Sequence, residues 1–183
     1  MVGLHVARAV TTVLRPATLA DVPALAVLAR DSFIAAFGHL YRPEDLALFL
    51  EEWRTEKAYL DALAVPAKRI QLAELDGRLA GYALIDLGDG FEERPAPQPA
   101  RPVMLSQLYC AADATGHGLG AALMDWAIAE ARAWNADALQ LSVFSENFGA
   151  QRFYQRYGFG HVADIDFWVG NHRDDEFLYE LKL

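Results

Sequence analysis

The sequence predicts an α/β (α+β) fold in which helices cover both faces of a mixed β-sheet. Runs of strand-forming residues alternate with segments whose apolar residues recur at helical spacing, in the order β-α-α-β-β-β-α-β-α-β-β. An Asp76-Gly77 turn separates two of the strand runs, as in a β-hairpin. With 183 residues the chain is long enough for one well-buried domain and short for two. We therefore expect a single domain over residues 1–183, with residues 1–9 as a loose leader.

The first half of the chain is predicted to supply a strand, two or three helices and the hairpin. The first strand covers residues 10–14. A helix then begins near Asp21, because Pro23 fits only into a first helical turn, and it ends at Gly38. The remaining segments are helices from about Glu44 and over 56–63, and hairpin strands over 69–75 and 78–85.

The second half opens with an irregular segment over residues 86–102. A loop of this length is commonly functional or disordered, and its acids form either a cation-attracting rim or part of a solvated loop; they are Asp86, Asp89, Glu92 and Glu93. Strands over 103–110 and 139–144 flank an alanine-rich helix, and a short helix follows Asn147. The chain closes with strands over 161–169 and 176–183, joined by a turn at 170–175.

Composition excludes several classes of function. A net charge of −9 argues against partners that need basic patches, such as nucleic acid and anionic membranes. The acidic balance suits a cationic substrate, or serves solubility alone. No apolar run spans a bilayer and no secretory signal is present, so we expect a cytoplasmic protein. The single Cys110 and five scattered His predict neither a disulfide nor a metal site.

A glycine-rich turn links strand 103–110 to the helix after it. Gly116, Gly118 and Gly120 let backbone approach a ligand closely, and the free N–H groups of the first helical turn suit a phosphate. Ala121-Ala122 stands where a Walker loop needs Lys followed by Ser or Thr, and the strict spacing of two does not fit a Rossmann fingerprint. Taken alone, the turn is either an anion site or a plain tight connection.

A second stretch decides between these alternatives. Together with the glycine turn it resembles the acetyl-CoA-binding core of the GCN5-related N-acetyltransferases (GNAT), over about residues 103–160. One family motif reads Asn-x-x-Ala-x-x-Phe-Tyr-x-x-x-Gly-Phe, and here its positions are Asn147, Ala150, Phe153, Tyr154, Gly158 and Phe159. The other reads Gln/Arg-x-x-Gly-x-Gly/Ala, which Gly118 and Gly120 match. Thr115 departs from it and removes a side chain that often lies near the pyrophosphate.

The resemblance implies the GNAT fold: a mostly antiparallel sheet of about seven strands that splays between the fourth and fifth. It also implies acetyl-CoA as cosubstrate. Pantetheine would bind main-chain groups of Leu108 and Cys110, and Asn147 would hold the pantetheine or position its helix. The residues expected around the pyrophosphate are Thr115, Gly116, Gly118, Gly120 and Ala121.

Acetyl transfer needs a neutral amine, a donor for the oxyanion and an acid for the departing thiolate. The resemblance implies that Tyr154 is the general acid and that the backbone N–H of Cys110 is the oxyanion donor. Without the resemblance, Tyr154 would be interpreted as a core aromatic. The base is not identified. Family members often place a Glu where Ser106 and Gln107 stand here, and a water relay to another acid, such as Asp86 or Glu51, is one alternative. We expect the Cys110 thiol to be structural.

Looser matches over 31–38, 43–46, 167–170 and 174–176 are similar to the bacterial spermidine and spermine N-acetyltransferases. Four acids either attract a polyamine or form a solvated helix face: Glu44, Asp45, Glu51 and Glu52. We therefore expect an N-acetyltransferase acting on a small-molecule amine, in particular a cationic one such as a polyamine. Two alternatives stay open, a protein or peptide N-acetyltransferase and a non-enzymatic acyl-CoA-binding module. The acyl length and the oligomeric state, a homodimer included, also stay open.

Overall fold

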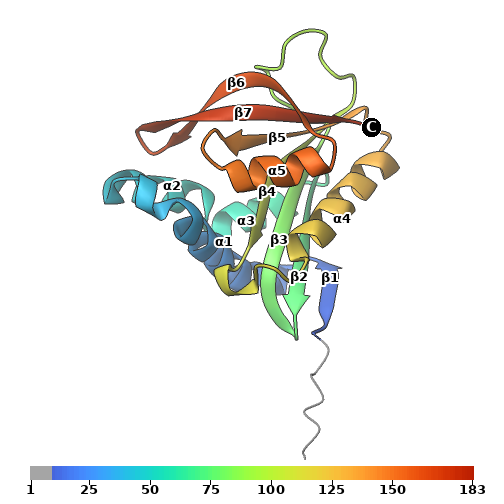
Figure 1. Ribbon diagram of the computed structural model, residues 1–183. Helices are drawn as coiled ribbons and strands as arrows, with labels where there is room; N and C mark the ends of the chain where they lie inside the picture. The colour runs from blue at the N-terminus through green and yellow to red at the C-terminus, as the bar shows by residue number, and fades with distance from the viewer. Residues whose placement is uncertain (1–9) are drawn as a thin grey trace, which may run out of the picture.

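A computed structural model describes residues 10–183, so the expected leader lies outside the described residues. Seven strands form one mixed sheet in the order β1-β2-β3-β4-β5-β7-β6 (Figure 1). All neighbours pair antiparallel except β4 and β5, which pair parallel. The predicted fold class is confirmed. The strands are β1 Thr12–Pro16, β2 Lys68–Leu75, β3 Arg78–Leu87, β4 Pro102–Cys110, β5 Ala138–Phe144, β6 Gly160–Val169 and β7 His172–Lys182.

Helices cover both faces of the sheet, as predicted. On one face α4 buries Leu123 and Met124 against the sheet, and α5 adds part-buried aromatics to the same core. On the other face α1 and α3 bury Leu25 and Tyr59 against β2 and β3. Within residues 10–183, no helix has both the length and the apolar character that crossing a membrane requires. The helices are α1 Val22–Phe37, α2 Pro43–Trp53, α3 Glu56–Leu63, α4 Leu119–Ala133 and α5 Phe148–Arg156.

The N-terminal strand lies two residues later than predicted. Arg15 and Pro16 pair with β2, and the Arg15 side chain is held by the Asp21 carboxylate at 2.7 Å. Asp21 does precede α1 directly, as the sequence indicated. Its carboxylate does not cap that helix, however, because it accepts hydrogen bonds from Arg15 and Thr18.

Both hairpin turns contain residues with positive φ. Asp76 and Gly77 have φ of 52° and 80°, which confirms the predicted turn between β2 and β3. The turn predicted at 170–175 is wrong, because only Gly170 and Asn171 separate β6 from β7. Residues 172–175 instead pair with β6, so β7 begins four residues earlier than expected. This register places Asp174, Glu176 and Leu178 along one face of β7.

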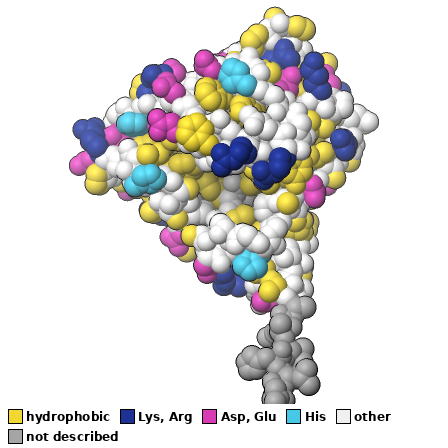
Figure 2. Space-filling view, in the orientation of Figure 1, with side chains coloured by type: hydrophobic (Ala, Val, Ile, Leu, Met, Phe, Trp, Pro, Cys, Tyr) yellow, Lys and Arg dark blue, Asp and Glu magenta, His cyan; other side chains and the backbone are white. Residues whose placement is uncertain are grey.

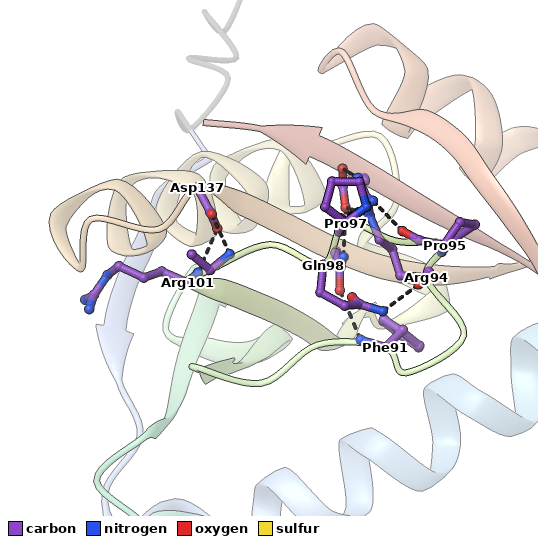
Figure 3. Close-up of polar contacts among 10 residues, drawn as sticks. Phe91, Arg94, Pro95, Pro97, Gln98, Arg101 and Asp137 are labelled. Atoms are coloured by element: carbon purple, nitrogen blue, oxygen red, sulfur yellow. Dashed lines mark hydrogen bonds and ion pairs between the residues drawn. The ribbon is translucent and has the colours of Figure 1, made fainter.

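The irregular segment after β3 is anchored at the end of the sheet where β4 begins. Arg94 donates two hydrogen bonds to the Glu180 carboxylate at 2.8 and 2.9 Å. Figure 3 shows Arg94 also reaching the carbonyls of Pro95 and Pro97, and the Arg101 amide donating to Asp137. The amide of residue 100 donates to the same carboxylate. Of the four acids expected in this segment, Asp86 and Asp89 line a cavity beside α2 and α3, whereas Glu92 and Glu93 line neither that cavity nor the one described below.

The sheet opens between β4 and β5. These strands pair only over residues 102–104 and 138–140, near their N-terminal ends. Beyond that point β4 stays paired with β3, and β5 stays paired with β7. The splay predicted between the fourth and fifth strands is confirmed, and it leaves backbone groups of both strands available to a ligand.

Candidate active site

A cavity of about 360 Å³ opens where β4 and β5 diverge. We call it the splay cavity. Its walls come from α1, α5, β7 and the facing ends of β4 and β5, and Figure 2 shows a recess next to α5, with basic side chains over that helix. Five of the predicted site residues line it: Leu108, Cys110, Thr115, Asn147 and Tyr154. The sequence therefore located this cavity, although it did not identify all of its walls.

The backbone N–H groups of Leu108 and Cys110 point into the splay. The N–H of Ala111 donates to the Ala80 carbonyl at 2.8 Å, and Cys110 is the next residue in the same β3–β4 register. Hydrogen-bonding direction alternates along an antiparallel ladder, so Cys110 and Leu108 face away from β3. No β5 residue pairs with them. Their N–H groups are therefore placed to donate to a bound acyl group or pantetheine.

The glycine turn leaves open space in front of the α4 N-terminus. Gly116 and Gly118 have φ of 82° and 77°, a conformation that glycine adopts without strain. A Cβ built on either residue meets nothing within 4 Å. Gly118 is the N-cap of α4 and supplies no capping side chain, so the first N–H groups of the helix, including those of Gly120 and Ala121, can receive a ligand. This arrangement suits a pyrophosphate.

Two predicted contact residues have structural partners of their own. The Thr115 hydroxyl donates to the Ala112 carbonyl at 3.1 Å, inside the turn. The Asn147 side chain accepts from the Ala150 N–H at 3.1 Å and so caps α5. Of the two roles expected for Asn147, the contacts support positioning the helix.

Tyr154 projects from α5 into the splay cavity. Burial raises the pKa of its hydroxyl above the ordinary value of 10, and nearby Tyr109, Glu176 and Cys110 add to the shift. The described residues give its Oη no hydrogen-bond partner, while the ring packs on Phe159 with centroids 5.9 Å apart. The hydroxyl is therefore protonated at neutral pH and available to a ligand.

The Cys110 side chain behaves as a structural thiol. Burial raises its pKa to about 11, so the thiolate is scarce at neutral pH. The expectation that this sulfur is not a nucleophile agrees with its surroundings.

Glu176 of β7 lines the splay cavity and was not identified from the sequence. Burial raises the pKa of its carboxyl to about 7, with a partial offset from Ser142 and a further increase from Asp174. Its Oε2 is buried and has no hydrogen-bond partner among residues 10–183. A carboxylate that titrates near 7 and keeps one oxygen unpaired can accept a proton from a ligand.

The other residues considered for the role of the base do not present a free carboxylate to the splay cavity. Asp86 is paired with Lys68 and accepts from the Ser106 hydroxyl at 2.7 Å. Glu51 is exposed and does not line the splay cavity. Gln107, on β4, accepts hydrogen bonds from Tyr59 and Tyr82. None of these residues offers an unpaired carboxylate to the splay cavity.

Arg54 also lines the splay cavity, and it too was not identified from the sequence. Only 5% of it is exposed, and its guanidinium lies 5.0 Å from the centroid of the Phe49 ring and 5.7 Å from that of Tyr109. Burying a cation costs several kcal/mol, and a ring face returns roughly 0.5–2 kcal/mol. A ring face does not, however, supply an in-plane acceptor for Nε–H, which has no partner among the described residues.

The sequence matches the family described as "Acetyltransferase (GNAT) family" over residues 29–159. An uncharacterised N-acetyltransferase of Mycobacterium tuberculosis is 32% identical over 165 residues, which cover 90% of this chain and 99% of that protein. One from Lactobacillus delbrueckii subsp. lactis is 29% identical, covering 89% and 92%.

Solved structures show the same fold. PaiA N-acetyltransferase from Thermoplasma acidophilum, in complex with coenzyme A, aligns with a TM-score of 0.75 and 19% identity, covering 94% of this chain and 99% of that one. A ribosomal-protein-alanine N-acetyltransferase from Brucella melitensis aligns with a TM-score of 0.70 and 22% identity, covering 93% and 99%. With the family match over most of its length, this chain belongs to the acetyltransferase (GNAT) family and is an acetyl-CoA-dependent N-acetyltransferase.

Proposed function

We propose that the chain transfers the acetyl group of acetyl-CoA directly to a primary amine held in the splay cavity. One observation carries the proposal. The Cys110 N–H points into the splay, and the Tyr154 hydroxyl and the Glu176 carboxylate line the same cavity from two other elements. These three groups are the donor, the acid and the base that acetyl transfer requires.

The cosubstrate would enter along the splay. The open N-terminus of α4 would receive the pyrophosphate, and the N–H groups of Leu108 and Cys110 would bind the pantetheine and the thioester oxygen. Thr115, Gly116, Gly118, Gly120 and Ala121 keep their proposed place at the phosphate end. The Asn147 contribution is indirect, because its side chain holds the α5 turn that presents Tyr154.

In the reaction the protonated amine loses a proton to Glu176, and the neutral amine that results attacks the thioester carbon. The Cys110 N–H stabilises the oxyanion that forms. The C–S bond then breaks, the thiolate of coenzyme A takes the Tyr154 proton, and the remaining extra proton on the acetylated nitrogen returns to the Tyr154 oxygen. The pKa of Glu176, about 7, allows it to accept a proton near neutral pH, while the raised pKa of Tyr154 keeps that hydroxyl protonated until the thiolate departs.

A polyamine acceptor, and the narrower similarity to the spermidine and spermine enzymes, stay predictions. Of the four acids behind them, Asp45 is 2% exposed and accepts from Asn171 and Arg42 within the fold. Glu44 and Glu51 line neither cavity. Glu52 borders only a second cavity beside α2 and α3. Within the splay cavity, the charge of the acceptor therefore depends on residues other than these.

The test is to incubate the purified protein with acetyl-CoA and a panel of amino acids, monoamines, polyamines and peptides, and to follow free thiol. Mass spectrometry of the product identifies the acetylated nitrogen. We expect one class of amine to release thiol in stoichiometric proportion to the acetylated product. Acetyl-CoA binding without release by any amine would contradict the proposal and favour a non-enzymatic acyl-CoA-binding protein.

A further inference from the structure

The charged lining of the splay cavity consists of one cation and one acid. Among residues 10–183, Arg54 and Glu176 are its charged side chains, and every other lining residue is apolar, aromatic or neutral polar. They come from different elements, because Arg54 directly follows α2 and Glu176 lies on β7. A ligand with one charge of each sign would match this lining.

Arg54 has no acidic partner in the described part of the chain. No Asp or Glu of residues 10–183 forms an ion pair with it within 4.0 Å. Its Nη1 donates to the Trp53 carbonyl at 3.2 Å, and its Nε has no hydrogen-bond partner within residues 10–183. Arg94, which is partly buried, has by contrast a two-pronged pair with Glu180. The guanidinium of Arg54 is thus left with donors that a planar anion can use.

The position of Arg54 relates it to the reacting groups. Its guanidinium lies 5.7 Å from the centroid of the Tyr109 ring, and Tyr109 directly precedes Cys110, whose N–H is the proposed oxyanion donor. Arg54 also lines the second cavity, beside α2 and α3, together with Gln107 and Phe167. It therefore stands at the acceptor end of the site, away from the glycine turn where the phosphates would bind.

We propose that Arg54 binds a carboxylate of the acceptor, so that the acceptor is a small amino carboxylate of the amino acid class. This inference rests on the proposed function. The amine of such an acceptor faces Glu176 and Tyr154, and its carboxylate meets the guanidinium fork. Inside the splay cavity, the second cation of a polyamine would instead meet the positive charge of Arg54. The acids that could receive it line the second cavity, namely Glu52, Asp61, Asp86 and Asp89.

The test compares matched acceptors that differ only in the carboxylate. Thiol release is measured with L-phenylalanine against phenethylamine, L-leucine against isopentylamine, and L-lysine against cadaverine. We expect kcat/KM for at least one amino acid to exceed that of its decarboxylated partner about 100-fold, because a site built around a buried donor rejects the analogue that lacks the acceptor. Equal or faster acetylation of the amines would overturn the inference while leaving the proposed function intact.

Variants of Arg54 attribute the preference to this side chain. Arg54→Met keeps the packing against the rings and removes the charge, and we expect it to reduce the amino acid preference to within about threefold. Arg54→Lys keeps the charge without the fork and should retain an intermediate preference. An unchanged ratio in Arg54→Met, with a melting temperature like that of the wild type, would contradict the inference.

A binding measurement tests the role of Arg54 even if the protein turns over no acceptor. Calorimetry is carried out with protein saturated with coenzyme A, titrated with N-acetyl-L-phenylalanine and, in parallel, with N-acetylphenethylamine. We expect only the carboxylate to bind to the wild type, and neither to bind detectably to Arg54→Met. Equal binding of the two ligands to the wild type, or binding of neither, would contradict the role of Arg54 even if no acceptor is turned over.

Discussion

Arg54 and Glu176 line the same cavity without forming an ion pair with each other. In most proteins a buried cation and a buried acid that share a cavity would pair, since each lowers the cost of burying the other. Here Nε of Arg54 and Oε2 of Glu176 are the two buried side-chain atoms without a partner among residues 10–183. Both atoms that lack a hydrogen-bond partner thus lie where the acceptor would bind.

Glu176→Gln is expected to lower kcat/KM about 100-fold, the usual contribution of a general base. The variant should fold with a melting temperature equal to or above that of the wild type, because it removes a buried ionisable group. Asp175→Asn is the matched control. Asp175 neighbours Glu176 on β7 but is exposed and pairs with Arg173 outside the cavity, so its loss should leave turnover unchanged. Wild-type turnover in Glu176→Gln would exclude it as the base.

The pH dependence of turnover should follow Glu176. Its carboxylate accepts a proton only when ionised, so kcat/KM is expected to rise with pH through a midpoint near 7 and then level off. An acceptor with an amine pKa well above 7 would add a second rise. The Glu176→Gln variant should lose the midpoint near 7 in its remaining activity, and persistence of that midpoint would assign it to another group.

The ionisation of Glu176 should also affect stability, with the opposite dependence on pH: the free energy of unfolding should fall as the pH rises. The folded protein keeps the Glu176 proton up to about pH 7, whereas the unfolded chain releases it near 4.5. Raising the pH from about 4.5 to 7 therefore favours unfolding, at a cost of about 3 kcal/mol once both states are ionised. Urea unfolding of wild type and Glu176→Gln across this range measures it. The variant should gain stability relative to the wild type as the pH rises, and a constant difference would contradict the raised pKa.

Gly118→Ala tests the open N-terminus of α4. At a φ of 77° a side chain is strained by about 1–2 kcal/mol, although the added Cβ meets nothing within 4 Å. Gly77→Ala is the matched control, since it has a φ of 80° and equally open surroundings in a distant hairpin. Both variants should lose similar stability, while only Gly118→Ala should bind acetyl-CoA about tenfold more weakly by calorimetry. Equal affinities in the two variants would argue against a ligand at this turn.

Asn147→Ala is expected to lower the free energy of unfolding by about 1 kcal/mol, because it removes the cap of α5. Asn147→Asp restores a capping oxygen without the amide. If Asn147 acts by positioning α5, Asp restores both the melting temperature and kcat/KM. Restored stability with kcat/KM still at the level of Asn147→Ala would instead indicate a direct contact of the amide with pantetheine.

The parts of the site that the sequence predicted are those carried by contiguous motifs. A glycine turn between a strand and a helix specifies its own backbone shape, and the Asn147 to Phe159 motif contains its own cap and its Gly158 ending. The same local signals predicted the Asp76-Gly77 hairpin. Boundaries that depend on strand pairing, such as the start of β7, were displaced because the pairing partner lies elsewhere in the chain.

Glu176 and Arg54 could not be found in this way. The place of Glu176 depends on its register opposite Phe144 of β5 and on the two-residue turn before β7. The burial of Arg54 depends on the packing of Phe49 and Tyr109, which are five and 55 positions away in the sequence. No short sequence pattern predicts the position of Glu176 or the burial of Arg54. The alternation of Asp174, Glu176 and Leu178 along one strand face was the signal closest to revealing the acid.

The most direct test of the account is the turnover number of Tyr154→Phe with saturating acetyl-CoA and the best acceptor, beside Tyr179→Phe. Tyr179 contacts α5 through a hydrogen bond from Gln155 but does not line the splay cavity, so its variant controls for the loss of a hydroxyl near that helix. We predict that Tyr154→Phe loses kcat about 100-fold with acetyl-CoA affinity within about twofold of the wild type, and that Tyr179→Phe keeps both. Equal kcat in Tyr154→Phe and the wild type would contradict the acid role on which the mechanism depends.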